Sequence, residues 1–111
     1  MNKSEFAELV LMRLNVIGAG EASEAQDNAL VQQAYDFYHA ELLERAIANW
    51  SADAIPDRIA EPLAQCMKVR LTAQFNSSAT FDRDSWMRAE RALFDLLANK
   101  KTENPTTAEY F

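Results

Sequence analysis

Residues 23–49 have the sequence SEAQDNALVQQAYDFYHAELLERAIAN, and this stretch decides the fold. It contains neither glycine nor proline, and its many Ala, Leu, Glu and Gln residues favour helix. Ser23, with Gln26 three residues later, has the pattern of a capping box. The sequence therefore predicts one long helix that begins after Ser23 and ends near Asn49.

The apolar residues of this helix fall on two sides when successive residues are placed 100° apart. The main side comprises Leu30, Val31, Ala34, Tyr35, Phe37, Tyr38, Leu42 and Ala46, and the weaker side comprises Ala25, Ala29, Ala40, Leu43 and Ile47. A helix with two apolar sides is either central in its own domain or contacts a neighbouring chain.

Three more helices are predicted around the long one, and no segment alternates like a strand. The first is expected to run from about Ser4, its N-cap, to Asn15, and the glycines of Gly18-Ala19-Gly20 are expected to stop it there. The third is expected to have Pro62 in its first turn and to end near residue 75. The fourth is expected to begin after a cap at Asp82 or Asp84 and to end near residue 99.

These elements predict an all-α fold, a small bundle of about four helices in one domain that covers residues 1–99. Residues 100–111 are predicted to form an extended C-terminal tail, because the sequence turns polar and Pro105 disfavours helix. A chain of 111 residues has room for a single core. Two glycines and three prolines are too few for the tight turns of a sandwich or barrel.

The chain is acidic, with a net charge of −6 and a pI near 4.7. Nucleic-acid binding depends on Lys and Arg to neutralise phosphates, so we expect no such binding surface. The acidity is concentrated in residues 21–44, which contain six Asp and Glu and no Lys or Arg. This run predicts a solvated face or, in a ring around DNA, a wall that repels phosphate.

Neither the cysteine nor the histidine predicts a reactive centre. Cys66 is the only cysteine, which excludes an intrachain disulfide and favours a reducing compartment. With no basic residue beside it in sequence, Cys66 is interpreted as a small core residue. His39 is interpreted as a surface or half-buried residue, because no spacing suggests a nucleophile or metal partner. We expect no catalytic residue, cofactor site, metal site, signal peptide or membrane span.

Four residues of the long helix are candidates for contact with a partner protein. Glu41 and Arg45 lie four residues apart in the favourable order and project into the main apolar side. They are interpreted as a pair at the edge of the core or, alternatively, as a polar pair that sets register at an interface between chains. Leu43 and Ile47 belong to the weaker apolar side and join them as candidates.

Tyr110 and Phe111 end the predicted tail and are the remaining candidates for partner binding. A polar terminus is disordered by default. Aromatic residues are nevertheless typical anchors at interfaces, and an extended tail can add a strand to a partner's sheet. Both interpretations of residues 100–111, a flexible tail and a partner-docked tail, stay open.

Five segments follow one another in a recognisable order. Leu14-Asn15-Val16-Ile17-Gly18-Ala19-Gly20 ends a short helix, and Asn49-Trp50 ends a long one. A connector, Ala54-Ile55-Pro56-Asp57, precedes Glu61-Pro62-Leu63, which opens the next helix, and the tail ends Tyr110-Phe111. This order resembles the head–tail connector proteins of tailed bacteriophages, also called adaptor or head-completion proteins.

The resemblance implies a ring of identical subunits under the phage portal, which assembles in the bacterial cytoplasm and remains in the virion. Such a ring extends the DNA channel, helps to retain the packaged genome and offers a docking surface to the stopper or tail. The implied partners are the portal, the stopper or tail-completion protein and other copies of the chain. DNA passes without sequence-specific binding, and no membrane, cofactor or catalytic residue is implied.

A second interpretation of the sequence is a small acidic helical regulator that binds one host or phage protein, as a DNA mimic does. Such a mimic needs its carboxylates in a regular array. The acidic residues of residues 21–44 are interrupted by apolar ones, which disfavours this alternative.

Overall fold

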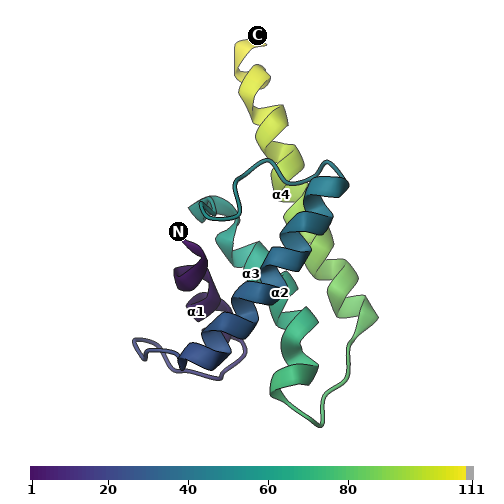
Figure 1. Ribbon diagram of the computed structural model, residues 1–111. Coiled ribbons are helices and arrows are strands. Elements are labelled where there is room, and N and C mark those ends of the chain that lie inside the picture. The colour runs from purple at the N-terminus through teal and green to yellow at the C-terminus, as the bar shows by residue number, and fades with distance from the viewer. Residues whose placement is uncertain (110–111) are drawn as a thin grey trace.

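In the computed structural model, the backbone is described for residues 1–109 and the side chains for residues 1–98. Four helices follow in the order α1 (Lys3–Arg13), α2 (Ala25–Glu44), α3 (Asp57–Phe75) and α4 (Arg83–Glu109), as Figure 1 shows. No strand occurs over this described backbone. The predicted all-α bundle of four helices is confirmed.

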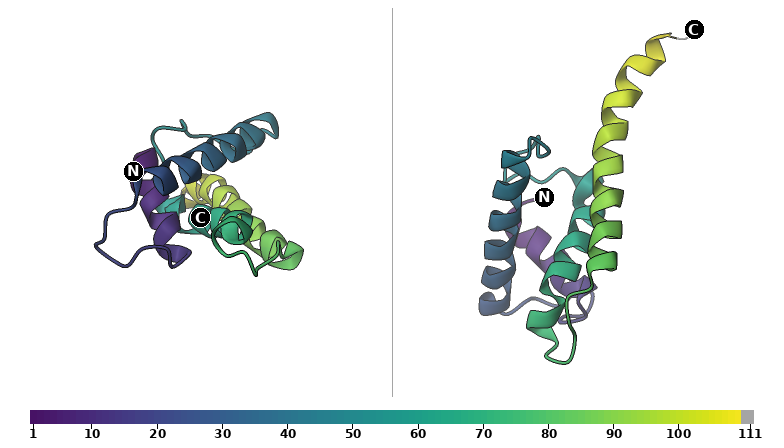
Figure 2. Two further views of the ribbon diagram at one scale, coloured as in Figure 1. Left: turned by 60° about the horizontal axis from the view of Figure 1, so that its bottom comes forward. Right: turned by 90° about the vertical axis from the view of Figure 1, so that its right-hand side faces the viewer.

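Helix α3 lies in the middle of the bundle (Figures 1 and 2). It packs against α1 and α4, and α2 packs mainly against α1. Within the described residues the backbones of α2 and α4 do not come close to each other, so side chains alone join these two helices. Each of them therefore keeps a large surface that no other helix covers.

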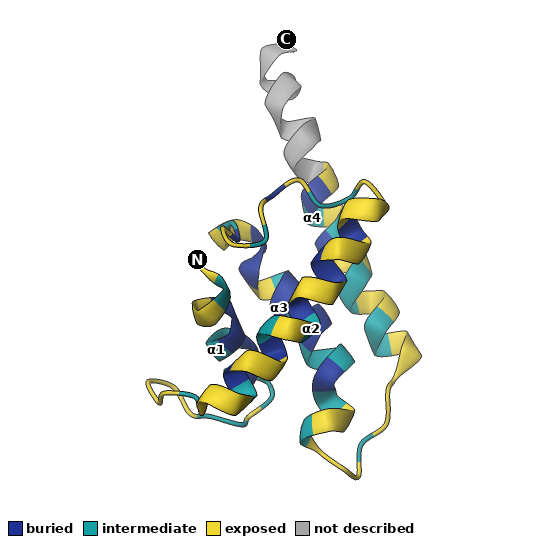
Figure 3. Cartoon of the chain, viewed as in Figure 1, coloured by how far each residue is buried: buried dark blue, intermediate teal, exposed yellow. Residues whose placement is uncertain are grey.

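A single core fills the space between the helices, as the buried residues in Figure 3 show. The rings of Phe6 and Tyr35 lie 5.1 Å apart and join α1 to α2. Burial of these apolar side chains supplies the main stabilisation of the fold. The largest fully buried side chains are Tyr35, Tyr38, Phe6, Leu11, Leu42, Ile55, Ile59, Leu63, Met67, Leu93, Val10 and Val31.

Both ends of α1 differ from the prediction. Asn2, rather than Ser4, is the N-cap, because its side chain accepts a hydrogen bond from the backbone of Glu5, 2.8 Å away, while the Glu5 carboxylate accepts one from the backbone of Asn2. The helix ends before the predicted glycines, because Asn15 takes the left-handed conformation, with φ 63°. Asparagine tolerates that conformation better than most residues, so no glycine is needed here.

Helix α2 begins later and ends earlier than predicted. Glu24 precedes its first turn without a side-chain cap, because the Ser23 hydroxyl is engaged by Glu8 instead. At the other end Ala46 has φ 58°, and the Ile47 N–H donates a 2.8 Å hydrogen bond to the carbonyl of Leu42. These are the marks of a Schellman motif, which stops the helix at Glu44 rather than near Asn49.

The bounds of α3 and α4 also refine the prediction. α3 begins at Asp57, which places Pro62 in its second turn rather than its first. Asp82 is confirmed as the cap before α4, since it accepts hydrogen bonds from the Asp84 backbone and the Ser85 hydroxyl. α4 continues to Glu109, past the end that the sequence predicted near residue 99. The proposed docking of the tail rests on side chains outside the described residues.

Candidate interaction surface

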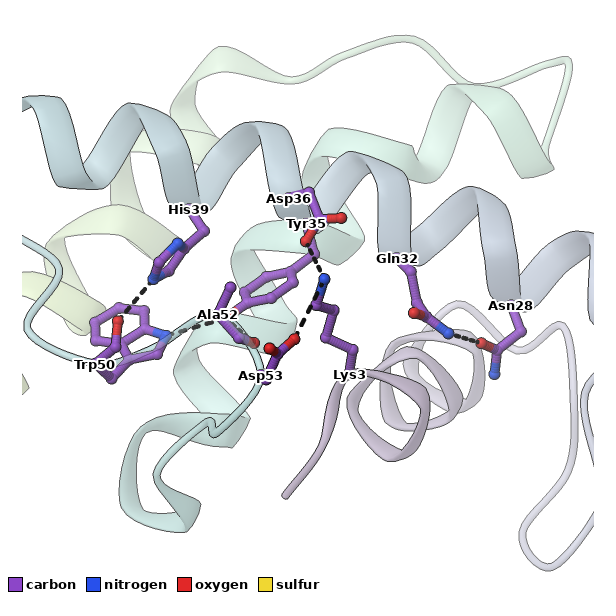
Figure 4. A network of polar contacts seen from close by, with 9 residues as sticks. All are labelled: Lys3, Asn28, Gln32, Tyr35, Asp36, His39, Trp50, Ala52 and Asp53. Carbon is purple, nitrogen blue, oxygen red and sulfur yellow. Dashed lines mark hydrogen bonds and ion pairs between the residues drawn. The ribbon is translucent and has the colours of Figure 1, made fainter.

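His39 lies within α2 and points to the segment that follows this helix (Figure 4), and the prediction of a surface or half-buried residue is wrong. His39 is buried, and its Nε2 lies 2.8 Å from the backbone carbonyl of Trp50, so Nε2 carries the proton that this bond needs. The Trp50 indole N–H donates to the Tyr35 hydroxyl at 3.0 Å, and that hydroxyl donates to the carbonyl of Ala52 at 3.1 Å. Burial raises the pKa of Tyr35. This network fixes the segment after α2 against the helix.

Cys66 is fully buried in the core, as the sequence predicted. Burial raises the pKa of its thiol to about 12, so the thiol stays protonated near neutral pH. Among the residues with described side chains, no group of three or more His, Cys, Asp or Glu is placed to hold a metal ion.

Tyr38 and Glu90 form the main link between α2 and α4. The Tyr38 hydroxyl donates a 2.6 Å hydrogen bond to Oε2 of Glu90, and burial raises the pKa of Tyr38. The Arg45 guanidinium lies 3.5 Å from the same oxygen and 5.3 Å from the centre of the Phe94 ring. Arg45 therefore helps to hold the end of α2 against α4.

Arg70 of α3 also contacts residues of both α2 and α4. Its guanidinium lies 5.1 Å from the Tyr38 ring centre and 5.5 Å from that of Trp86, and it forms a 2.9 Å ion pair with Glu41. The prediction that Glu41 and Arg45 pair with each other is therefore wrong. Glu41 pairs with Arg70 of α3, and Arg45 pairs with Glu90 of α4. Both remain partly exposed at the rim of the interhelical contact.

Several large apolar side chains of α2 lie on the surface. Phe37 is 64% exposed, and Leu30, two helical turns before it, is also exposed. Both residues were predicted on the main apolar side, which was expected to face the core. Leu43, a predicted partner residue, is 53% exposed on a different side of the helix. Ile47 is half-buried beside Phe94. Exposed apolar side chains of this size on a helix are typical of contact surfaces.

A second surface, on α4 around Met87, was missed by the sequence reasoning. Met87 is 56% exposed and, with Phe94, lines a shallow hollow of about 640 Å³ whose other lining residues are charged: Asp84, Arg88, Glu90, Arg91 and Asp95. The signal was present in the spacing of residues 84, 87, 91, 94 and 98, which share one side of a helix. The other predicted contacts, Tyr110 and Phe111, lie outside the described residues.

Searches of protein-family models, curated protein sequences and solved structures find nothing that matches this chain. No helix in the described part of the chain combines the length and the apolar character needed to cross a bilayer.

Proposed function

We propose that this protein is a head–tail connector subunit of a tailed phage or prophage, which binds under the portal as a ring and extends the DNA channel. The observation that carries the proposal is the pair of exposed surfaces, on α2 around Phe37 and on α4 around Met87. A subunit of a ring needs surfaces for neighbouring subunits besides those for the portal and the stopper. The portal and the stopper are proposed as partners because the order of the helices resembles that of head–tail connector proteins.

The acidic run is consistent with a channel lining. Glu24 is exposed and forms no ion pair within the described residues, so it would present uncompensated negative charge to passing DNA. Negative charge facing DNA repels its phosphates and lets the duplex slide.

The same residues give less support to a DNA mimic. Three of the six acidic side chains are engaged within the chain: Asp36 pairs with Lys3, Glu41 pairs with Arg70, and Glu21 accepts a hydrogen bond from the Gly18 backbone. The carboxylates that remain free do not form the continuous array that a protein needs to imitate DNA.

The experiment that tests the proposal mixes the purified protein with portal particles from the same phage or prophage and images them by electron microscopy. We expect a ring of added density at the outer end of the portal. A chain without residues 106–111 shows whether the tail contributes. Portal particles that remain bare at saturating protein would overturn the proposal.

A further inference from the structure

We infer that two copies of the chain meet through different surfaces, with the exposed side of α2 from one copy packing against the exposed side of α4 from the next. The inference rests on the proposed ring and names the faces that form it. Within the described residues no other helix covers the α2 side, and the α4 side is covered only near Phe94, by Arg45 and Ile47.

The α2 stripe consists of five positions that follow one another at intervals of three and four residues. All five are exposed, and Phe37 stands at the centre. This spacing places side chains along one side of a helix in the manner that lets two helices pack with a small crossing angle. The α2 stripe comprises Leu30, Gln33, Phe37, Ala40 and Glu44.

The α4 stripe has the same intervals and the same length. Four of its positions are exposed, while Phe94 is half-buried under Arg45. Met87 and Phe94 provide the apolar floor of the hollow on this helix, and Arg91 stands between them at the centre. Aligned by their centres, the stripes bring the Arg91 guanidinium to the Phe37 ring, a favourable cation–π arrangement. The α4 stripe comprises Asp84, Met87, Arg91, Phe94 and Ala98.

The charges of the two helices favour α4 of a second copy as the surface that packs against the α2 stripe. The segment 21–44 has no Lys or Arg, so two α2 stripes would bring like charges together. Within the described side chains, five cationic residues form no ion pair, and three of them, Arg83, Arg88 and Arg91, belong to α4, where they outnumber the two unpaired acidic residues, Asp84 and Asp95. Arg88 also donates to Ser85, whereas Arg91 has no such bond among the described side chains. The chain therefore carries both members of a complementary pair.

A contact between two different surfaces has a consequence for assembly. Each copy that offers its α2 stripe to one neighbour retains its α4 stripe for another. Contacts of this kind lead to closed rings or to open filaments. The arrangement therefore supplies the lateral contact that a connector ring requires.

The test uses two full-length variants, Phe37→Asp and Met87→Asp. Self-association is measured by sedimentation velocity over a concentration series up to about 1 mM, so that weak association is also detected. Both substituted side chains are largely exposed, so each variant keeps the core intact. We expect the unmodified protein to associate and each variant to associate at least about tenfold more weakly, as when a central interface residue is lost. The matched control is Phe81→Asp, whose side chain is 53% exposed and lies outside both stripes, and it should behave as the unmodified chain does.

Mixing the two variants distinguishes a contact between unlike surfaces from one between like surfaces. One variant retains an intact α4 stripe and the other an intact α2 stripe, so a 1:1 mixture should form heterodimers. Unmodified protein that remains monomeric, a single variant that associates normally, or a mixture that stays monomeric would each overturn the inference.

The inference and the proposed function fail in different ways. If both variants still form the complete ring on portal particles, the α2–α4 contact is wrong and the connector function stands. If the copies associate through the two stripes while portal particles remain bare, the contact stands and the connector function is wrong.

Discussion

The Tyr38 hydroxyl donates a 2.6 Å hydrogen bond to Glu90 and thereby joins two helices whose backbones stay apart. Tyr38 is fully buried, and the Glu90 side chain is only 15% exposed. A buried polar group that loses its partner costs free energy, because water cannot replace the lost bond.

Replacing Tyr38 with Phe removes this donor and leaves the Glu90 carboxylate without it. We expect the free energy of unfolding to fall by about 1–3 kcal/mol, measured by urea denaturation followed by circular dichroism. Glu90→Gln is the control, because its amide oxygen still accepts from Tyr38, and it should cost less. Equal stability of Tyr38→Phe and the unmodified protein would contradict this interpretation.

The end of α2 offers a test of backbone conformation. Ala46 has φ 58°, where an alanine is strained and a glycine is not. Ala46→Gly should therefore raise the free energy of unfolding by about 1 kcal/mol. The matched control, Ala40→Gly, lies on the exposed side within α2 and should lower it by about 1 kcal/mol, the usual cost of glycine in a helix. Effects of the same sign at both positions would refute the assignment of the helix end.

Glu61 gives the protein a contribution to stability that depends on pH. Its carboxylate receives two hydrogen bonds from Arg13, at 2.6 and 2.7 Å, which lower its pKa from 4.5 to about 2. A lowered pKa means that the contribution is complete above pH 4.5 and is lost as the pH falls through 2. Because both side chains are well exposed, we expect Glu61→Gln to cost less than about 1 kcal/mol at pH 7.

The measurement for this pair is the free energy of unfolding at several pH values between 7 and 2. The difference between Glu61→Gln and the unmodified protein should shrink as the pH falls below 4.5. Arg13→Gln should cause a similar loss at pH 7, and the double variant should cost less than the two single losses combined. A difference that is constant across this range would argue against the ion pair.

Burial should protect the Cys66 thiol from modification. Its pKa rises from 9.0 to about 12, which lowers the thiolate fraction roughly 1,000-fold at pH 8. We expect Ellman's reagent to react slowly with the native protein and rapidly with the urea-unfolded protein, while Cys66→Ala gives no reaction in either state. Equal rates in the two states would place the thiol on the surface.

The existence and number of the helices followed from the sequence, because apolar periodicity and the scarcity of glycine and proline are local signals. The helix ends were harder to predict. Asn15 and Ala46 take a left-handed conformation that glycine usually occupies, so neither residue was recognised as the signal that ends its helix. Ser23 matched a capping box but bonds to Glu8, which lies 15 residues away in the chain.

The candidate surface was predictable only in part. Glu41 and Arg45 were recognised, but their partners, Arg70 and Glu90, lie 29 and 45 residues away, and no local spacing identifies them. Phe37 belongs to the predicted core-facing side of α2, but the other helices cover only part of that side and leave Phe37 exposed. Which edge of an apolar side remains exposed depends on the packing of the other helices.

The link between α2 and α4 through side chains alone implies that the bundle does not open as one unit. Helix α3 contacts each of the other three helices and its middle is buried, so the amide hydrogens there should exchange with solvent last. The second half of α2 buries Tyr38, His39 and Leu42, but its polar bonds to α3 and α4 come from Tyr38, Arg45 and Glu41 alone. Loss of those bonds would weaken the hold of α4 on this half of α2 more than the packing among α1, α2 and α3, so amide exchange there should be faster than in α3.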